Sequence, residues 1–335
     1  MGWTLTSLAA RAGRLVGATP GWRGSAEVAH VRAVAEHGVR ADGATVTARV
    51  YARRLEAAAP ADRKALEAAH SELGDDSAVI ERATASGAPL TAVAALAAAW
   101  HRLPDTAKET IRRPAGRGIG PVRFGSIRAV QVDQTTCGAA VMAMMLMQGD
   151  PFVAAWVATG RSLGDHLPSE AAAALEHGPR TIEERWQALQ RVLHGATTSR
   201  GLGVAPWPKA FGTPPWRVDD VTRYSGLRFR GAILDDRDPG VMEAALAHAS
   251  AALRDGMPVP LYAGGDSGGG LDQVMPRHVV LLTARTETGL EVYEPSSGRV
   301  LPLGVDRFVD GGGKEPALGH WSRLSWMVLP RPAKH

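Results

Sequence analysis

The sequence predicts an α+β protein in which a bundle of helices precedes a domain built on an antiparallel sheet. Residues 1–112 form alanine-rich, weakly amphipathic segments separated by Gly, Pro and Asp, which is typical of short helices packed as a bundle. After residue 258 the pattern changes to short apolar runs joined by tight turns, which is typical of antiparallel strands. A chain of 335 residues is also long enough for about two domains.

Glycine and proline are concentrated in residues 113–121, and such a segment cannot continue a helix. We therefore expect a linker there, between a helical domain over 1–112 and a second domain over 122–335. Three roles fit the helical domain equally well: a pro-segment, an adaptor or a substrate-docking module. A linker of this composition would suit proteolytic nicking, so self-processing at 113–121 is a hypothesis.

Hydrophobic periodicity and helix-stop residues place the individual elements. We expect helices over residues 3–15, 28–38, 45–57, 61–73, 90–103, 137–148, 168–177, 181–194 and 241–254. We expect strands over residues 258–262, 278–283, 289–293, 299–303 and 325–329. The prolines in the first of these runs restrict it to a sheet edge or to the start of a strand, because proline cannot donate a ladder hydrogen bond.

Composition and charge argue against several classes of protein. The net charge is +4, but the charges are scattered, so neither a nucleic-acid-binding arm nor a basic membrane patch is predicted. No apolar stretch approaches the roughly 18 residues that a membrane span needs, and the N-terminus does not resemble a signal peptide. We expect a cytoplasmic protein, or one exported without a recognisable signal peptide. The histidines show no metal-ligand spacing, no cofactor is expected, and the pattern does not indicate an oligomeric state.

Cys137 is the single cysteine, which excludes an intramolecular disulfide and makes this residue a candidate nucleophile. It lies where an apolar helix is predicted to begin, and the partial positive charge of a helix N-terminus favours a thiolate. Gly138 follows it and permits close approach of a substrate. His278 opens a predicted strand, and Glu294 follows the end of the next one. Two antiparallel strands joined by a tight turn would bring these two side chains together, as a base and the carboxylate that orients it.

Two glutamines precede the cysteine and carry side-chain amides that can stabilise an oxyanion. Gln131 fits either an oxyanion donor or a surface residue, whereas Gln134 is more typical of a surface or supporting position. Simpler interpretations stand beside the catalytic one: a buried structural thiol, a strand histidine bonded to a backbone carbonyl, and a turn carboxylate before a proline. The combination of these residues in this order along the chain favours catalysis.

The segment Gln131–Gly138, with the sequence QVDQTTCG, resembles the active-site segment of the double-glycine leader peptidases. These are papain-like cysteine proteases that process bacteriocin precursors. The strings HVVLL from His278 and EPSSG from Glu294 resemble the later motifs of that family in order and spacing. The resemblance covers residues 122–330. It implies a papain-like fold, a Cys137–His278–Glu294 triad, and a place for Gln131 in the oxyanion hole.

Three features depart from that family. Thr136 stands where the family usually has Asp, and Glu294 replaces a shorter Asp. The gap between Cys137 and His278, 278 − 137 = 141 residues, is longer than the family norm and implies an insertion around 160–235. Such an insertion would reshape the substrate cleft, so cleavage of double-glycine leaders is not implied.

These residues predict a cysteine peptidase that cleaves a peptide or protein through a thioester acyl-enzyme. The same triad would support glutamine deamidation or transglutamination, as in some bacterial toxins, and the acceptor side of the cleft decides between these outcomes. A catalytically silent papain-like binding protein is a second alternative. The loop Gly265–Gly270 (GDSGGG) resembles the nucleophile loop of trypsin-like serine proteases, but the all-β architecture of that family is not predicted. We expect a glycine-rich loop between two strands there.

Overall fold

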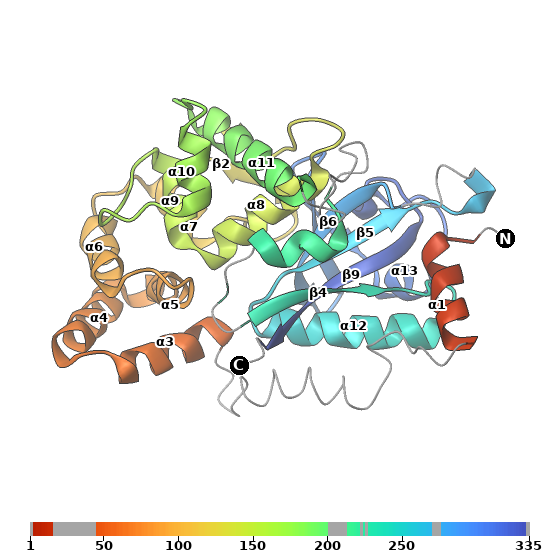
Figure 1. The fold of residues 1–335 in the computed structure, drawn as a ribbon, viewed down its shortest axis with the longest axis horizontal. Coiled ribbons are helices and arrows are strands. Elements are labelled where there is room, and N and C mark those ends of the chain that lie inside the picture. The colour runs from red at the N-terminus through yellow and green to blue at the C-terminus, as the bar shows by residue number, and fades with distance from the viewer. Residues whose placement is uncertain are drawn as a thin grey trace.

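The computed structural model describes residues 3–15, 45–199, 213–221, 224, 227–269 and 276–332 of the chain. In this part the protein combines helices with an antiparallel sheet, so the predicted α+β class is confirmed at that level. Figure 1 shows a group of helices at one end of the molecule and the sheet, flanked by helices, at the other. The helix predicted over 28–38 lies outside the described residues.

One seven-stranded sheet runs in the order β1-β8-β7-β6-β5-β9-β4, and every pairing in it is antiparallel. Its strands are β1 (Gly120–Pro121), β4 (Leu227–Ile233), β5 (Val259–Gly264), β6 (His278–Thr286), β7 (Gly289–Glu294), β8 (Arg299–Leu303) and β9 (Arg323–Pro332). A separate small hairpin is formed by β2 (Arg123–Phe124) and β3 (Ile127–Arg128). The strand that begins with His278 is therefore central in the sheet.

The helices that the structure describes agree with most of the predicted ranges. They are α1 (Leu5–Leu15), α3 (Val46–Ala57), α4 (Pro60–Leu73), α5 (Ala78–Ala85), α6 (Leu90–Trp100), α7 (Asp105–Arg112), α8 (Cys137–Gly149), α9 (Pro151–Thr159), α10 (Ser169–Leu175), α11 (Ile182–Thr198), α12 (Pro239–Arg254) and α13 (Val305–Asp310). Short 3₁₀ turns include η1 (Gly74–Asp76), η3 (Pro215–Val221), η4 (Ser267–Gly269) and η6 (Pro316–Leu318). The range 160–235, for which the resemblance implies an insertion, contains α10, α11, η3 and the edge strand β4.

The two faces of the sheet are covered by different helices (Figure 1). Arg285 of β6 donates a hydrogen bond to Ser250 of α12 at 2.6 Å, so its side chain marks the face that α12 covers. Arg285 pairs with Leu290 of β7, and Tyr293 lies three residues further along that strand, on the opposite face. The Tyr293 hydroxyl donates to the carbonyl of Ala129 at 2.7 Å, in the segment that leads into α8. The buried helix α8 therefore packs on the face opposite α12.

Strand β5 carries a proline although it lies between two neighbours. Pro260 is its second residue and pairs with Leu281 of β6. The ladder between β5 and β9 begins only at Leu261, so Pro260 lies beyond the end of that ladder. The prediction of a strand start is therefore correct for this proline, because its missing N–H falls where one neighbour has ended.

The N-terminal helices α3–α7 share one hydrophobic core with α8–α11 and the sheet. Arg82 of α5 reinforces this contact, because its guanidinium donates to the carbonyls of Ile111 and Arg112 at the end of α7 and of Gln148 near the end of α8, at 2.6, 3.1 and 2.9 Å. The predicted linker over 113–121 is part of the same body. Ala115 is buried, and β1 pairs with β8.

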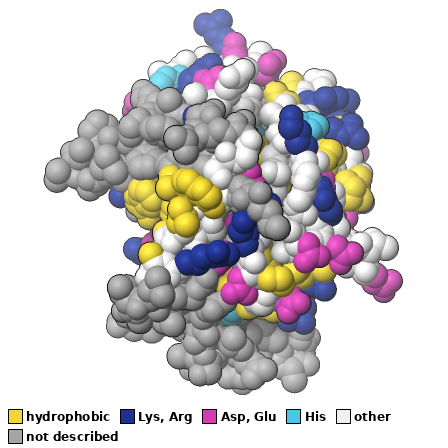
Figure 2. Space-filling view, turned by 90° about the vertical axis from the view of Figure 1, so that its right-hand side faces the viewer, with side chains coloured by type: hydrophobic (Ala, Val, Ile, Leu, Met, Phe, Trp, Pro, Cys, Tyr) yellow, Lys and Arg dark blue, Asp and Glu magenta, His cyan; other side chains and the backbone are white. Residues whose placement is uncertain are grey.

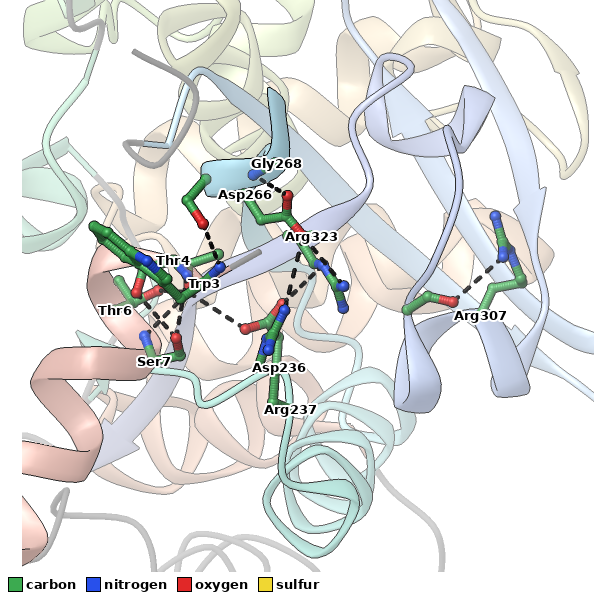
Figure 3. A network of polar contacts seen from close by, with 12 residues as sticks. Trp3, Thr4, Thr6, Ser7, Asp236, Arg237, Asp266, Gly268, Arg307 and Arg323 are labelled. Carbon is green, nitrogen blue, oxygen red and sulfur yellow. Dashed lines mark hydrogen bonds and ion pairs between the residues drawn. The ribbon is translucent and has the colours of Figure 1, made fainter. Parts of the chain in front are cut away.

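Helix α1 packs with the sheet rather than with the other N-terminal helices. It contacts β4 and β9, and the residues before it are tied to the β5–β6 connection and to the segment after β4 (Figure 3). The backbone N–H of Trp3 donates to Ser267 at 2.8 Å, and Thr4 donates to Asp236 at 3.3 Å. Part of the loop Gly265–Gly270 is thus held in place by the N-terminal segment.

The outer edge of the sheet at β4 is covered by η3. Asp219 of η3 accepts a hydrogen bond from the backbone N–H of Phe229 at 2.5 Å and forms an ion pair with Arg228 at 2.7 Å. A backbone donor of the edge strand is thereby satisfied by a carboxylate of the same chain.

Charged side chains of both signs lie among hydrophobic ones on the face that carries α1 (Figure 2). Leu5 and Leu8 of this helix are 41% and 44% exposed. Among the described helices, none is by itself long and apolar enough to cross a membrane; α8 and α9 meet that criterion only when taken together, and they are bent by 112° at their junction.

Candidate active site

Cys137 is the first residue of α8 and is 3% exposed. The turn before it is fixed by Thr136, whose hydroxyl accepts from the Asp133 N–H at 2.9 Å and donates to the Asp133 carbonyl at 3.0 Å. Thr136 occupies the N-cap position but gives α8 no side-chain cap. The N–H groups in the first turn of α8 are therefore not capped by the Thr136 side chain, and they can donate to a group bound next to the thiol.

The β6–β7 hairpin brings His278 and Glu294 together, as the strand pattern predicts. Leu281 pairs with Tyr293, so the register places Glu294 opposite Val280, two residues along the same face from His278. The His278 Nε2 and Glu294 Oε1 atoms are 2.8 Å apart, and both residues are buried. This contact occupies Nε2 and leaves Nδ1 as the ring nitrogen for a second partner.

Cys137 is a second residue that acts on the His278 ring. Burial by itself lowers the pKa of His278, but hydrogen bonds with Cys137 and Glu294 and the negative charges of both outweigh it and raise the pKa to about 9. The imidazole is consequently stabilised as a cation beside Cys137 and the Glu294 carboxylate. The three residues that the sequence singled out as a triad are brought together in this structure.

Glu294 is held by its own turn as well as by the histidine. It accepts hydrogen bonds from the Ser296 N–H at 2.9 Å, the Ser296 hydroxyl at 2.6 Å and the Ser297 N–H at 2.7 Å. Burial alone would raise the pKa of this carboxyl, but the hydrogen bonds from His278, Ser296 and Ser297 outweigh it and lower the pKa to about 2. The turn-residue interpretation and the catalytic one are therefore compatible at this position.

Gln131 lies beside this turn. Its backbone N–H donates to the carbonyl of Pro295 at 2.9 Å, and its side-chain amide donates to the carbonyl of Asp133 at 2.6 Å. A primary amide has two N–H donors, so one remains for another acceptor. Gln134 is exposed, in keeping with a surface position.

Two glycines allow close packing around the triad. A Cβ at Gly138 would lie 2.6 Å from Cβ of Thr213, so the segment before η3 packs directly against the first turn of α8. Gly319, just after η6, has a φ of +65°, and a Cβ there would lie 2.4 Å from Cδ2 and 2.6 Å from Nε2 of His278. Neither Thr213 nor Gly319 was predicted from the sequence, because no motif marks either residue.

In the described part of the chain, no three His, Cys, Asp or Glu side chains converge in a way that would hold a metal ion. No family model, curated protein or solved structure matches this chain. The resemblance to the double-glycine leader peptidases and the papain-like fold that it implies therefore stay predictions. What the site contains is a buried thiol at a helix N-terminus, a cationic imidazole beside it and a carboxylate that orients the imidazole, which is an arrangement suited to acyl transfer through sulfur.

Proposed function

We propose that this protein is a cysteine peptidase with a papain-like active site, in which Cys137, His278 and Glu294 form the catalytic triad. The observation that supports this most strongly is the placement of His278, which bonds Glu294 through Nε2 and also bonds Cys137. A histidine between a lone thiol and a carboxylate is the arrangement that activates a cysteine nucleophile.

In the proposed reaction the Cys137 sulfur attacks the carbonyl carbon of a peptide bond, and the carbonyl oxygen becomes an oxyanion. The backbone N–H of Cys137 and the remaining amide N–H of Gln131 donate to that oxyanion. As the C–N bond breaks, imidazolium His278 transfers its proton to the departing amine, which leaves a thioester on Cys137. Neutral His278 then takes a proton from water, the resulting hydroxide attacks the thioester, and the carboxylic acid product leaves as the thiolate is regenerated.

The first test is the rate at which iodoacetamide labels Cys137 as a function of pH, in the wild type and in His278→Ala. Because Cys137 is 3% exposed, restricted access lowers the absolute rate, whereas the pH midpoint of labelling reports the thiolate. We expect wild-type labelling to persist well below about pH 8.5, where ordinary thiols lose reactivity, and to move up to that range in His278→Ala.

Peptide cleavage is the second readout. The wild type should cleave an unfolded protein substrate such as casein, and Cys137→Ala should leave it intact. Release of ammonia from glutamine peptides, or incorporation of an added amine, without peptide-bond cleavage would replace the peptidase by a deamidase or transglutaminase. Labelling that follows an ordinary thiol in both the wild type and His278→Ala would refute an activated cysteine altogether.

A further inference from the structure

Tyr262 of β5 is a buried tyrosine whose hydroxyl has no hydrogen-bond partner among the described residues. The chain contains four tyrosines, all of them described. The other three donate to backbone carbonyls: Tyr51 to Leu66, Tyr224 to Met145 and Tyr293 to Ala129. Since buried phenol hydroxyls normally have a partner, this exception requires an explanation.

The sheet register places Tyr262 on the strand beside His278, on the face that α8 covers. On β5, Ala263 pairs with His278, and Tyr262 pairs with Val279. Leu281 links Tyr293 of β7 with Pro260 of β5 across the central strand, so Tyr262, two residues from Pro260, shares the face of Tyr293. This is the face that α8 covers. Tyr262 therefore points toward the helix that Cys137 begins, while His278 occupies the end of the neighbouring strand.

The electrostatics agree with this placement. Burial raises the pKa of Tyr262 well above its usual range, and the charge on Cys137 raises it further. The phenol consequently keeps its proton and remains able to donate a hydrogen bond.

We propose that the Tyr262 hydroxyl donates a hydrogen bond to the Cys137 sulfur whenever that sulfur is a thiolate, which makes Tyr262 a further catalytic residue. This inference rests on the proposed function, because it requires an activated Cys137. It gives the buried hydroxyl its missing partner and gives the thiolate a second donor beside His278. The proton stays on the tyrosine throughout. In the last step of the cycle, when the C–S bond breaks and the electron pair returns to sulfur, the hydroxyl stabilises the departing thiolate.

The test compares Tyr262→Phe with Tyr224→Phe in the full-length protein. Both substitutions remove one hydroxyl from a buried ring that faces α8, but Tyr224 donates to Met145 in the middle of that helix, away from the thiol. We expect Tyr262→Phe to raise the pH midpoint of iodoacetamide labelling by about one pH unit, the size of a lost hydrogen bond to a charged group. The chemical-denaturation midpoint should barely change, because no backbone acceptor is left unpaired. Tyr224→Phe should do the reverse: it should lower the denaturation midpoint and leave the labelling profile unchanged.

The outcomes separate the two proposals. An unchanged labelling profile in Tyr262→Phe, with a wild type that still depends on His278, would overturn the role of Tyr262 and leave the proposed peptidase standing. Equal shifts of the labelling profile in both tyrosine variants would also overturn it, since a general loosening of α8 would then explain the effect. A wild type that labels as an ordinary thiol, unaffected by His278→Ala, would remove the proposed function and with it this inference.

Discussion

Gly319 packs closely against the edge of His278, and its position makes a sharp test of the geometry of the triad. Replacing it with Ala would place a Cβ 2.4 Å from Cδ2 of the imidazole, so the ring has to move away from Glu294 or from Cys137. We expect Gly319→Ala to shift the pH profile of iodoacetamide labelling to that of His278→Ala. A displacement of about 1 Å is enough to reduce activity roughly a hundredfold, and casein cleavage should fall accordingly.

Gly178 supplies the matched control. It has the same φ of +65°, but a Cβ there would meet no atom within 4 Å. Gly178→Ala and Gly319→Ala thus share a backbone cost of about 1 kcal/mol, and only the second disturbs the histidine. If both variants kept wild-type labelling and cleavage, the position of the His278 ring would not depend on the absence of a side chain at residue 319, and the prediction would be wrong.

The sequence predicted the three proposed catalytic residues, but it did not predict the residues that pack around them. Cys137, His278 and Glu294 stand out because each begins or ends an element, and the strand period places the last two together. Gly319 and Tyr262 show no such signal. Their roles depend on which side of a strand faces which helix, and on how closely a distant turn approaches a ring, which a single sequence does not encode locally.

At the scale of elements, apolar patterns predicted eight of the described helices but not what they contact. Four further helices, α5, α7, α9 and α13, were not predicted. Helix α1 was expected within the N-terminal bundle, yet it lies against β4 and β9. An apolar stripe on a helix predicts that this face is buried, but it does not predict which element packs against it. Strand β4 was also missed. Arg228 and Arg230 alternate with apolar residues, as in a half-buried strand, but the alternation is short and ends at Gly231.

The contact between α5, α7 and α8 leads to a prediction about stability. Arg82→Met should lower the free energy of unfolding by about 2 kcal/mol, because three carbonyls at helix ends lose a charged donor. Arg63→Met is the matched control, since Arg63 also donates to carbonyls at the end of a helix, those of Leu55 and Glu56, but is exposed. Its effect should stay within about 0.5 kcal/mol. Urea denaturation measures both, and equal losses would show that Arg82 acts no differently from a surface residue.

For the whole molecule, the triad should make stability depend on pH. The pKa of Glu294 is lowered from 4.5 to about 2, so its contribution is present above pH 4.5 and is lost as the pH falls toward 2. The pKa of His278 is raised from 6.5 to about 9, so its contribution is present below pH 6.5 and is lost as the pH rises toward 9. The two contributions coexist between pH 4.5 and 6.5.

Comparison with Glu294→Gln isolates this effect, because the amide keeps the size of the side chain and removes its charge. The wild type should exceed the variant in free energy of unfolding by on the order of 2 kcal/mol between those two pH values. The difference should shrink on both the acid and the alkaline side. Urea titrations at acidic, intermediate and alkaline pH measure it, and a difference that stays constant across the series would contradict the paired charges.

The two edges of the sheet limit how the protein can associate with copies of itself. An open edge strand is a template on which another chain can add a strand, and repeated addition leads to aggregates. Here one edge is only Gly120–Pro121, which is short and lacks the N–H of its proline. At the other edge, Asp219 already occupies a backbone donor of β4. The sheet can therefore be rich in buried aliphatic residues although neither of its edge strands is open for another chain to add a strand.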